Sequence, residues 1–121
     1  MTDTRQDVTL YRGYDAVIRF PITAEPGGEG GPINVAGWAF EWRLAASPGA
    51  APLLTKTSAA SQIVVTGDSS LGIVDVLVSK DDPWSGIPAG RYWHELKLID
   101  TAAMQVPGAI GSAQVRDTLE A

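Results

Sequence analysis

The sequence predicts one all-β domain, an antiparallel sandwich or barrel of about seven to nine short strands. Thirteen glycines and eight prolines are spread along the 121 residues instead of being pooled in one linker. Between them lie short runs in which apolar and polar residues alternate with a period of two, as expected for strands with one buried face. The single short-helix signal is Asp82, a capping residue type, followed by Pro83 at a first helical position, so at most one helical turn is expected.

Composition limits the classes of function that this chain can have. A length of 121 residues and a hydrophobic fraction of 45% fit one domain with a core of its own. The absence of cysteine excludes a disulfide framework, a thiol nucleophile and a cysteine-ligated metal. With a net charge of −5 and scattered basic residues, nucleic-acid binding is not expected. No apolar run approaches the length of a membrane span, and the polar residues 1–7 do not resemble a secretory signal.

The domain organisation follows from the same pattern. Residues 1–6 are expected to form a mobile arm or an edge segment, residues 7–115 the β-sandwich domain, and residues 116–121 a polar tail.

The first half of the chain predicts strands over residues 8–12, 15–22 and 38–44. Pro21 cannot donate to a ladder, which places its strand at a sheet edge or at a bulge. The glycine-rich residues 24–32 lack the Gly-Lys-Ser/Thr ending of a phosphate-binding loop, so they are interpreted as a connection. In the third strand, burial of about 150–250 Å² per aromatic ring favours a core-facing row over a stacking platform. That row is Trp38, Phe40, Trp42 and Leu44.

The second half predicts strands over residues 53–57, 62–66, 73–78 and 90–100 and a last, broken strand ending at 115. In the strand 73–78, Asp75 is expected to point outward, because a buried unpaired carboxylate is costly. This register turns Val74, Val76 and Val78 inward. In the central strand 90–100, alternation divides two faces. Tyr92, His94, Leu96 and Leu98 are expected in the core, and Trp93, Glu95, Lys97 and Ile99 on the outer face.

Residues that could carry chemistry are few. His94 is the one histidine, so a two-histidine metal site is impossible, and a Ser-His-Asp arrangement would lack the Gly-x-Ser-x-Gly elbow. We interpret it as a partly buried residue that is hydrogen-bonded to a neighbouring strand or loop. Asp81 and Asp82 lack the spacing of a calcium loop. Glu41 and Glu95 are expected to be solvated and to pair with cations nearby on the sheet. The prediction is therefore a protein that is not an enzyme, with no catalytic residue, cofactor or metal.

The outer face of the central strand suggests a contact surface. An exposed apolar patch usually marks an interface, and Trp93, Ile99 and the preceding Trp84 would supply one. The candidate interface is therefore Trp84, Trp93 and Ile99. A carbohydrate-binding or adhesion module is the alternative. It would use Trp38, Trp42, Trp84 or Trp93 as a stacking platform, and it needs at least two exposed, coplanar indoles.

Five segments together carry a family pattern: residues 8–13, 33–38, 53–57, 72–82 and 89–100. The chain from about residue 7 to 110 resembles the immunoglobulin-like β-sandwich domain of tailed-phage virion proteins. It is similar to the N-terminal domain of phage baseplate upper proteins. The pattern departs at Tyr14, where that family often has an acidic residue, and in residues 108–118, which match only loosely.

The resemblance implies an immunoglobulin-like antiparallel sandwich with a non-enzymatic, structural role. It implies a multi-copy or symmetric homo-oligomeric component of a bacteriophage particle whose partners are other virion proteins. The place in the particle is left open between tail, baseplate, neck and head decoration. The expected location is the virion, after synthesis in the host cytoplasm.

Overall fold

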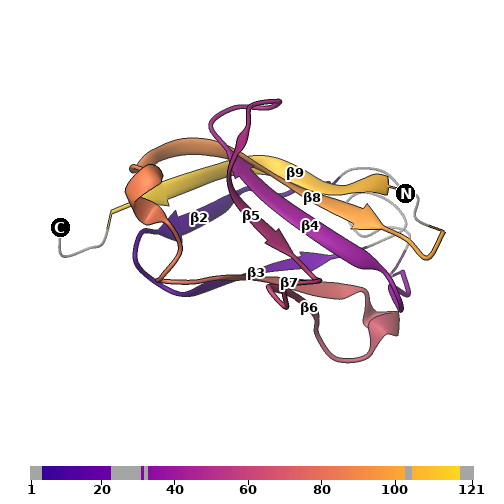
Figure 1. Cartoon of the computed structure of the whole chain (residues 1–121). Helices are drawn as coiled ribbons and strands as arrows, with labels where there is room; N and C mark the ends of the chain where they lie inside the picture. Colours follow the sequence, from indigo (N-terminus) through magenta and orange to yellow (C-terminus); the bar gives the residue numbers. More distant parts are fainter. Residues whose placement is uncertain (1–3, 23–30, 32, 103–104, 118–121) are drawn as a thin grey trace.

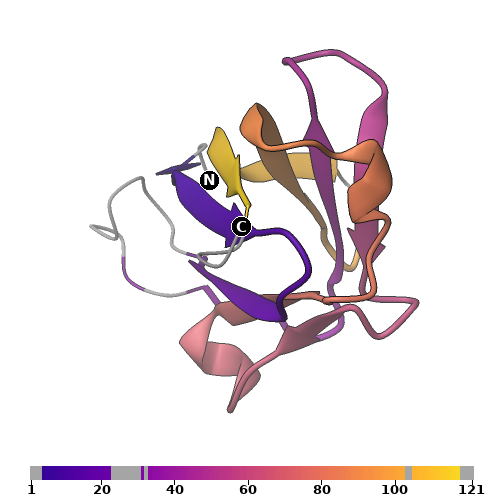
Figure 2. The ribbon, with the colours of Figure 1, turned by 90° about the vertical axis from the view of Figure 1, so that its left-hand side faces the viewer.

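The computed structural model describes residues 4–22, 31, 33–102 and 105–117. These residues form an all-β sandwich of two sheets, with two short 3-10 turns and no α-helix in the described part (Figures 1 and 2). The six-stranded sheet, called the large sheet, has the order β1-β9-β8-β4-β5, with β2 also beside β9. Its strands are β1 (Thr4–Arg5), β2 (Val8–Tyr11), β4 (Ala39–Ala45), β5 (Pro52–Thr57), β8 (Gly90–Ile99) and β9 (Gln105–Arg116).

The three-stranded sheet, called the small sheet, has the order β3-β7-β6 and packs against the large one as a second layer (Figure 2). Its strands are β3 (Ala16–Pro21), β6 (Ile63–Val65) and β7 (Ile73–Val78), and the 3-10 turns are η2 (Ser69–Leu71) and η3 (Trp84–Gly86). The strands β4, β8 and β9 correspond to the C, F and G strands of an immunoglobulin-like sandwich, and β5 to the extra strand of its variable type. The predicted fold class is confirmed.

Both ends of the described chain are attached to the sandwich. The strands β1 and β2 pair in parallel with β9, one after the other. Of the two alternatives expected for the N-terminus, a mobile arm or an edge segment, Thr4 and Arg5 therefore form the edge segment. Residues 1–3 lie outside the described residues. At the other end, Arg116 is the last residue of β9, and the carboxylate of Asp117 accepts a hydrogen bond of 2.8 Å from Arg12. Residues 118–121 of the predicted tail lie outside the description.

The core consists of alternate residues from both sheets, as the period-two pattern predicts. Trp38, at the end of the aromatic row, is only partly buried. The other inward residues predicted for three strands are buried: Phe40, Trp42 and Leu44 in β4; Val74, Val76 and Val78 in β7; Tyr92, His94, Leu96 and Leu98 in β8.

A cluster of rings joins the two sheets at the centre of the core. The Trp42 indole N–H donates to Nδ1 of His94 at 3.1 Å, and the rings of Phe20 and His94 lie 5.9 Å apart. Antibody domains place a disulfide between strands B and F beside a tryptophan of strand C. Here Phe20 on β3 and His94 on β8 take the cysteine positions. Tyr92, two residues before His94, donates its hydroxyl to the carbonyl of Pro88 at 2.5 Å, which is the tyrosine-corner contact of this fold.

The connection between β7 and β8 differs from the sequence-based expectation in two ways. Trp84 is buried, with 6% of its surface exposed, and its indole N–H donates to the carbonyl of Ser79 at 3.0 Å, so it belongs to the core. It therefore lacks the exposure on which its assignment to an interface rested. A helical turn does follow Pro83, but Asp82 does not cap it with its side chain. Instead, the Asp82 carboxylate accepts hydrogen bonds from the Ser79 backbone N–H at 2.8 Å and from Lys56 Nζ at 2.6 Å.

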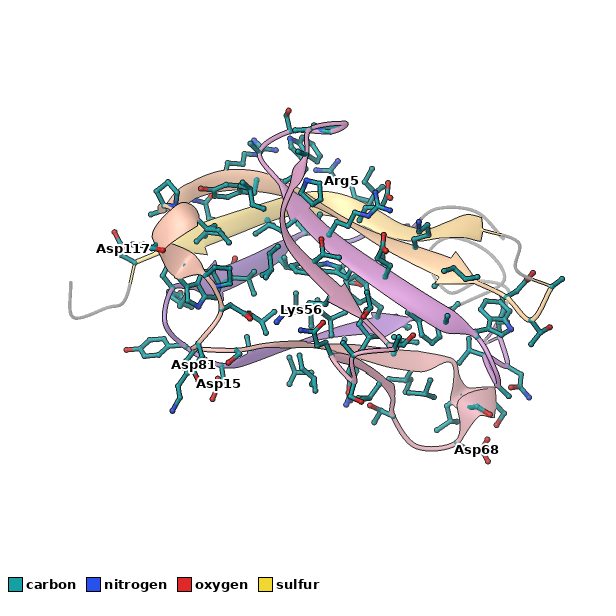
Figure 3. All side chains as sticks on the ribbon, viewed as in Figure 1. Arg5, Asp15, Lys56, Asp68, Asp81 and Asp117 are labelled. Carbon is teal, nitrogen blue, oxygen red and sulfur yellow. The ribbon has the colours of Figure 1, made fainter. Side chains whose placement is uncertain are left out.

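The ion pair of Lys56 and Asp82 is itself part of the sandwich. Lys56 lies on β5, at the edge of the large sheet, and its side chain points between the two sheets (Figure 3). Only 3% of this side chain is exposed, against 11% for Asp82. An inward-pointing charge on an edge strand also makes pairing with a further strand less favourable.

Candidate interaction surfaces

Trp93 lies on the outer face of the large sheet, as predicted, but it is only partly exposed. The guanidinium carbons of Arg5 and Arg91 each lie 5.6 Å from the centroid of its ring. Figure 3 shows Arg5 on this outer side of the molecule. Cations at this distance are attracted to the electron-rich face of an indole. Two cations of the chain itself therefore compete with any apolar partner for the Trp93 ring.

Charged side chains occupy the neighbouring part of the same face. Glu41 forms ion pairs with Arg43 and, at 3.5 Å, with Lys97, which confirms the pairing expected for Glu41. Burial alone would raise the pKa of Glu41, but the hydrogen bond and charge of Arg43, with the charge of Lys97, lower this pKa below its ordinary value. Ile99 is partly buried. Trp93 and Ile99 thus lie on the expected side of the central strand, but charged groups surround them and neither is fully exposed.

The outer face of the small sheet has the opposite character. Across β3 and β7, Val17 is opposite Leu77, Arg19 is opposite Asp75, and Pro21 is opposite Ile73. On β6, Val64 lies opposite Asp75 from the other side. Val17 is 60% exposed, Val64 39% and Leu77 38%. We call these seven outward residues the small-sheet face: Val17, Arg19, Pro21, Val64, Ile73, Asp75 and Leu77.

The charges at the centre of the small-sheet face neutralise each other. Arg19 donates from Nε and Nη2 to the two oxygens of Asp75 at 3.0 and 3.1 Å, and the Thr66 hydroxyl donates to the same carboxylate at 2.5 Å. The hydrogen bond from Arg19 lowers the pKa of Asp75, against the opposing effect of burial, with further contributions from Thr66 and the Arg19 charge. Asp75 therefore has the predicted outward direction, but Arg19 and Thr66 cover it, and its side chain is 8% exposed.

Hollows in the described surface lie beside both of these faces. One, of about 430 Å³, is open and borders the small-sheet face, with Val17, Leu77 and Ser79 among its lining residues. The other, of about 230 Å³, lies between the β4–β5 connection and β8, with Arg43, Pro48 and Trp93 in its wall. The first hollow adds concave apolar surface to the small-sheet face, and the second lies within the charged surroundings of Trp93.

His94 also lines the second hollow, but both of its ring nitrogens are already used. Nδ1 accepts from Trp42, so the proton is on Nε2, which lies 2.5 Å from the carbonyl oxygen of Gln6. Burial lowers the pKa of His94, and the Gln6 carbonyl and the charge of Asp7 oppose this shift only in part. The imidazole is therefore a neutral structural group, in agreement with the predicted buried, hydrogen-bonded histidine.

Neither a metal-binding cluster nor the stacking platform of the alternative hypothesis is found among the described residues. Among them, no group of three or more His, Cys, Asp or Glu side chains could hold a metal ion. Trp42 and Trp84 are buried, whereas Trp38 and Trp93 are partly buried. Trp38 precedes Ala39 at one end of β4, and Trp93 pairs with Ala45 at the other, a separation of roughly 20 Å at about 3.3 Å per residue. The platform of two exposed, coplanar indoles is not formed by these four residues.

Comparison with known proteins does not identify a family: no family model matches this chain, and no curated protein matches it. In the described part of the chain, no helix is long and apolar enough to cross a membrane.

Proposed function

We propose that this chain is a non-enzymatic structural component of a tailed-phage virion, present in many copies and bound to other particle subunits. The observation that carries the proposal is the exposed apolar surface of the small-sheet face, where Val17, Val64 and Leu77 are each more than a third exposed. The resemblance to sandwich domains of tailed-phage virion proteins supplies the class of assembly. The position in the particle stays open between tail, baseplate, neck and head.

The physical argument starts from the cost of exposed apolar surface. Burying such surface gives about 25 cal/mol per Å², and contiguous apolar patches on soluble proteins usually mark interaction sites. A sheet face without a covering element is also suited to stacking against a second sheet at about 10 Å. By contrast, His94, the one residue that was weighed for catalysis, is hydrogen-bonded inside the sandwich. A contact role therefore uses the surface that the fold leaves open.

The test is the composition of purified particles. Particles of a phage that encodes this chain would be isolated on a density gradient, and the chain would be quantified by mass spectrometry relative to a major structural protein. We expect a fixed ratio of several copies per particle. A chain that is made in infected cells but stays entirely in the particle-free fraction would overturn the proposal.

A matched pair of variants assigns the contact to the small-sheet face. Leu77→Lys places a charge on this face, whereas Leu53→Lys places one on β5 of the other sheet. The two leucines are similarly exposed, at 38% and 40%. We expect Leu77→Lys to lower the copy number per particle by about tenfold, because an unpaired charge in a contact is costly, and Leu53→Lys to leave it unchanged. Equal incorporation of both variants would contradict this assignment.

A further inference from the structure

We propose that the small-sheet face is a two-fold contact between two copies of this chain. This inference rests on the proposed function, since it names the partner that the exposed face receives. Three pairs follow one another along β3 and β7: the apolar pair Val17 and Leu77, the ion pair of Arg19 and Asp75, and the apolar pair Pro21 and Ile73.

Charge singles out this face as a place where two copies can meet. The chain has a net charge of −5, so two copies repel each other in most orientations. The seven residues of the small-sheet face include one cation and one anion, Arg19 and Asp75, which are bonded to each other. Two such faces can approach without like-charge repulsion. A polyanionic partner such as nucleic acid would need a cluster of uncompensated cations, which these seven residues do not supply.

The order of the pairs also selects the symmetry axis. A two-fold axis that lies in the contact plane, runs along the strands and passes between β3 and β7 places Arg19 of one copy over Asp75 of the other. The same rotation places Val17 over Leu77 and Pro21 over Ile73, so apolar groups meet apolar groups. An axis across the strands would instead place Arg19 over Arg19, with like charges together. The ion pair therefore favours the axis along the strands, and the contact is isologous.

Arg19 has the hydrogen-bonding capacity that this arrangement requires. Its side chain is 59% exposed, and it donates to Asp75 from Nε and Nη2. A guanidinium carries five N–H donors in a planar fork, so donors remain for the second copy.

The edge of β3 favours stacking of faces over addition of a strand. Gln6 Nε2 donates to the carbonyl oxygen of Arg19 at 2.9 Å, so this carbonyl points away from β7 and is already paired. Two residues on, Pro21 presents the same edge without an N–H. A strand added here would find the Arg19 carbonyl already bonded and no N–H on Pro21. Natural sheet edges use such features to prevent pairing with a further strand.

The first experiment measures self-association of the full chain by sedimentation equilibrium. We expect a reversible dimer, a dimer dissociation constant raised about tenfold or more by Leu77→Lys, and no change with the matched control Leu53→Lys. Circular dichroism spectra and thermal unfolding of each variant establish that it is folded. A wild-type chain that stays monomeric at millimolar concentration would overturn the contact, as would equal dimerisation of the two lysine variants.

The second experiment tests the axis by disulfide cross-linking. The natural chain has no cysteine, so each single-cysteine variant has one reactive thiol. We expect a mixture of Val17→Cys and Leu77→Cys chains, oxidised mildly, to form more mixed disulfide than either homodisulfide. The control mixture of Val17→Cys and Leu53→Cys should form none above background. A homodisulfide of Val17→Cys as the main product, or no cross-link in either mixture, would overturn the proposed arrangement.

The outcomes separate this contact from the proposed function. A monomeric chain that is nevertheless a stoichiometric part of purified particles would overturn the contact between copies and keep the virion role. A dimer with the predicted cross-link that is absent from particles would keep the contact and overturn the virion role.

Discussion

The outer faces of the two sheets differ in what covers their apolar groups. On the large sheet, Arg5 and Arg91 lie over the ring of Trp93, and Arg43 and Lys97 pair with Glu41. On the small sheet, one neutralised ion pair lies among apolar side chains that the described residues leave exposed. Alternation turned large apolar residues outward on both sheets. The difference shows that an outward tryptophan is a weaker sign of a contact surface than a group of outward aliphatic residues without neighbouring cations.

The largest effect is expected beneath both faces. Leu96 is fully buried at the centre of β8, so Leu96→Ala should lower the free energy of unfolding by about 2–5 kcal/mol. Trp93→Ala on the outer face should cost about 1–2 kcal/mol, since it removes two cation–π contacts and part of a half-buried ring. Urea denaturation of both variants measures the difference. Equal losses would mean that the outer face of the large sheet supports folding as much as the core does.

The pH dependence of stability distinguishes His94 in the core from the carboxylates on the two outer faces. The pKa of His94 is lowered in the folded state from its ordinary value of 6.5. Below about pH 6.5, the unfolded chain therefore protonates His94 more readily than the folded chain does. Stability should therefore be constant above about pH 6.5 and decrease below it, by at most about 1.4 kcal/mol per pH unit. The carboxylates of Glu41 and Asp75, whose pKa values are lowered, should add their own losses only below about pH 4.5.

Urea denaturation between pH 7.5 and 5 measures this slope in the natural chain and in His94→Gln. The variant should be less stable at neutral pH but should lose most of the slope. A variant with the full slope would assign the acid sensitivity to another group.

A smaller effect distinguishes the two ion pairs. Arg19→Ala leaves the covered carboxylate of Asp75 without its main partner, whereas Arg43→Ala leaves Glu41 with Lys97 at 3.5 Å. We expect Arg19→Ala to lower the melting temperature more than Arg43→Ala does, because only Arg43→Ala leaves its carboxylate with a second cation, and both losses should be small at these solvated sites. Thermal unfolding at pH 7 measures both. The reverse order would mean that the charges of the large-sheet face are the more strongly coupled.

The smallest expected effect is on self-association. Trp93→Ala should leave the dimer dissociation constant within about twofold of the natural value, because the proposed contact lies on the other sheet. Sedimentation equilibrium gives this constant under the same conditions as for Leu77→Lys. A loss of association as large as that of Leu77→Lys would move the contact to the large-sheet face.

Local periodicity was sufficient to predict most of the fold. Alternation placed Leu96 and His94 inside, and it turned Trp93 and Asp75 outward in their own strands. What alternation could not provide was the neighbour on another strand. The pairing of Arg19 with Asp75 depends on β3 lying beside β7, and the cover over Trp93 depends on Arg5, which comes from the opposite end of the chain.

The burial of Trp84 and the bonding partner of Asp82, both near η3, were missed for a similar reason. Trp84 lies in a 3-10 turn outside any alternating run, so no period predicts its burial; its ring packs in the core, and its indole N–H is satisfied by Ser79. Asp82 has the residue type of a helix cap, but Lys56 on β5 is its partner, and that choice is set by the packing of the two sheets. The residue type predicted that the Asp82 carboxylate would accept hydrogen bonds, but only the tertiary structure shows that Lys56 donates one of them.

The ring cluster of Phe20, Trp42 and His94 has a consequence for the conditions under which this sandwich folds. Domains held by an inter-sheet disulfide require an oxidising environment, and thiol reductants weaken them. Here the ring contact between Phe20 and His94, whose centroids lie 5.9 Å apart, occupies that position, and the chain has no cysteine. The domain thus has no disulfide for a reductant to break. Because burial lowers the pKa of His94, we expect acidity to be the chemical signal that loosens the centre of this domain.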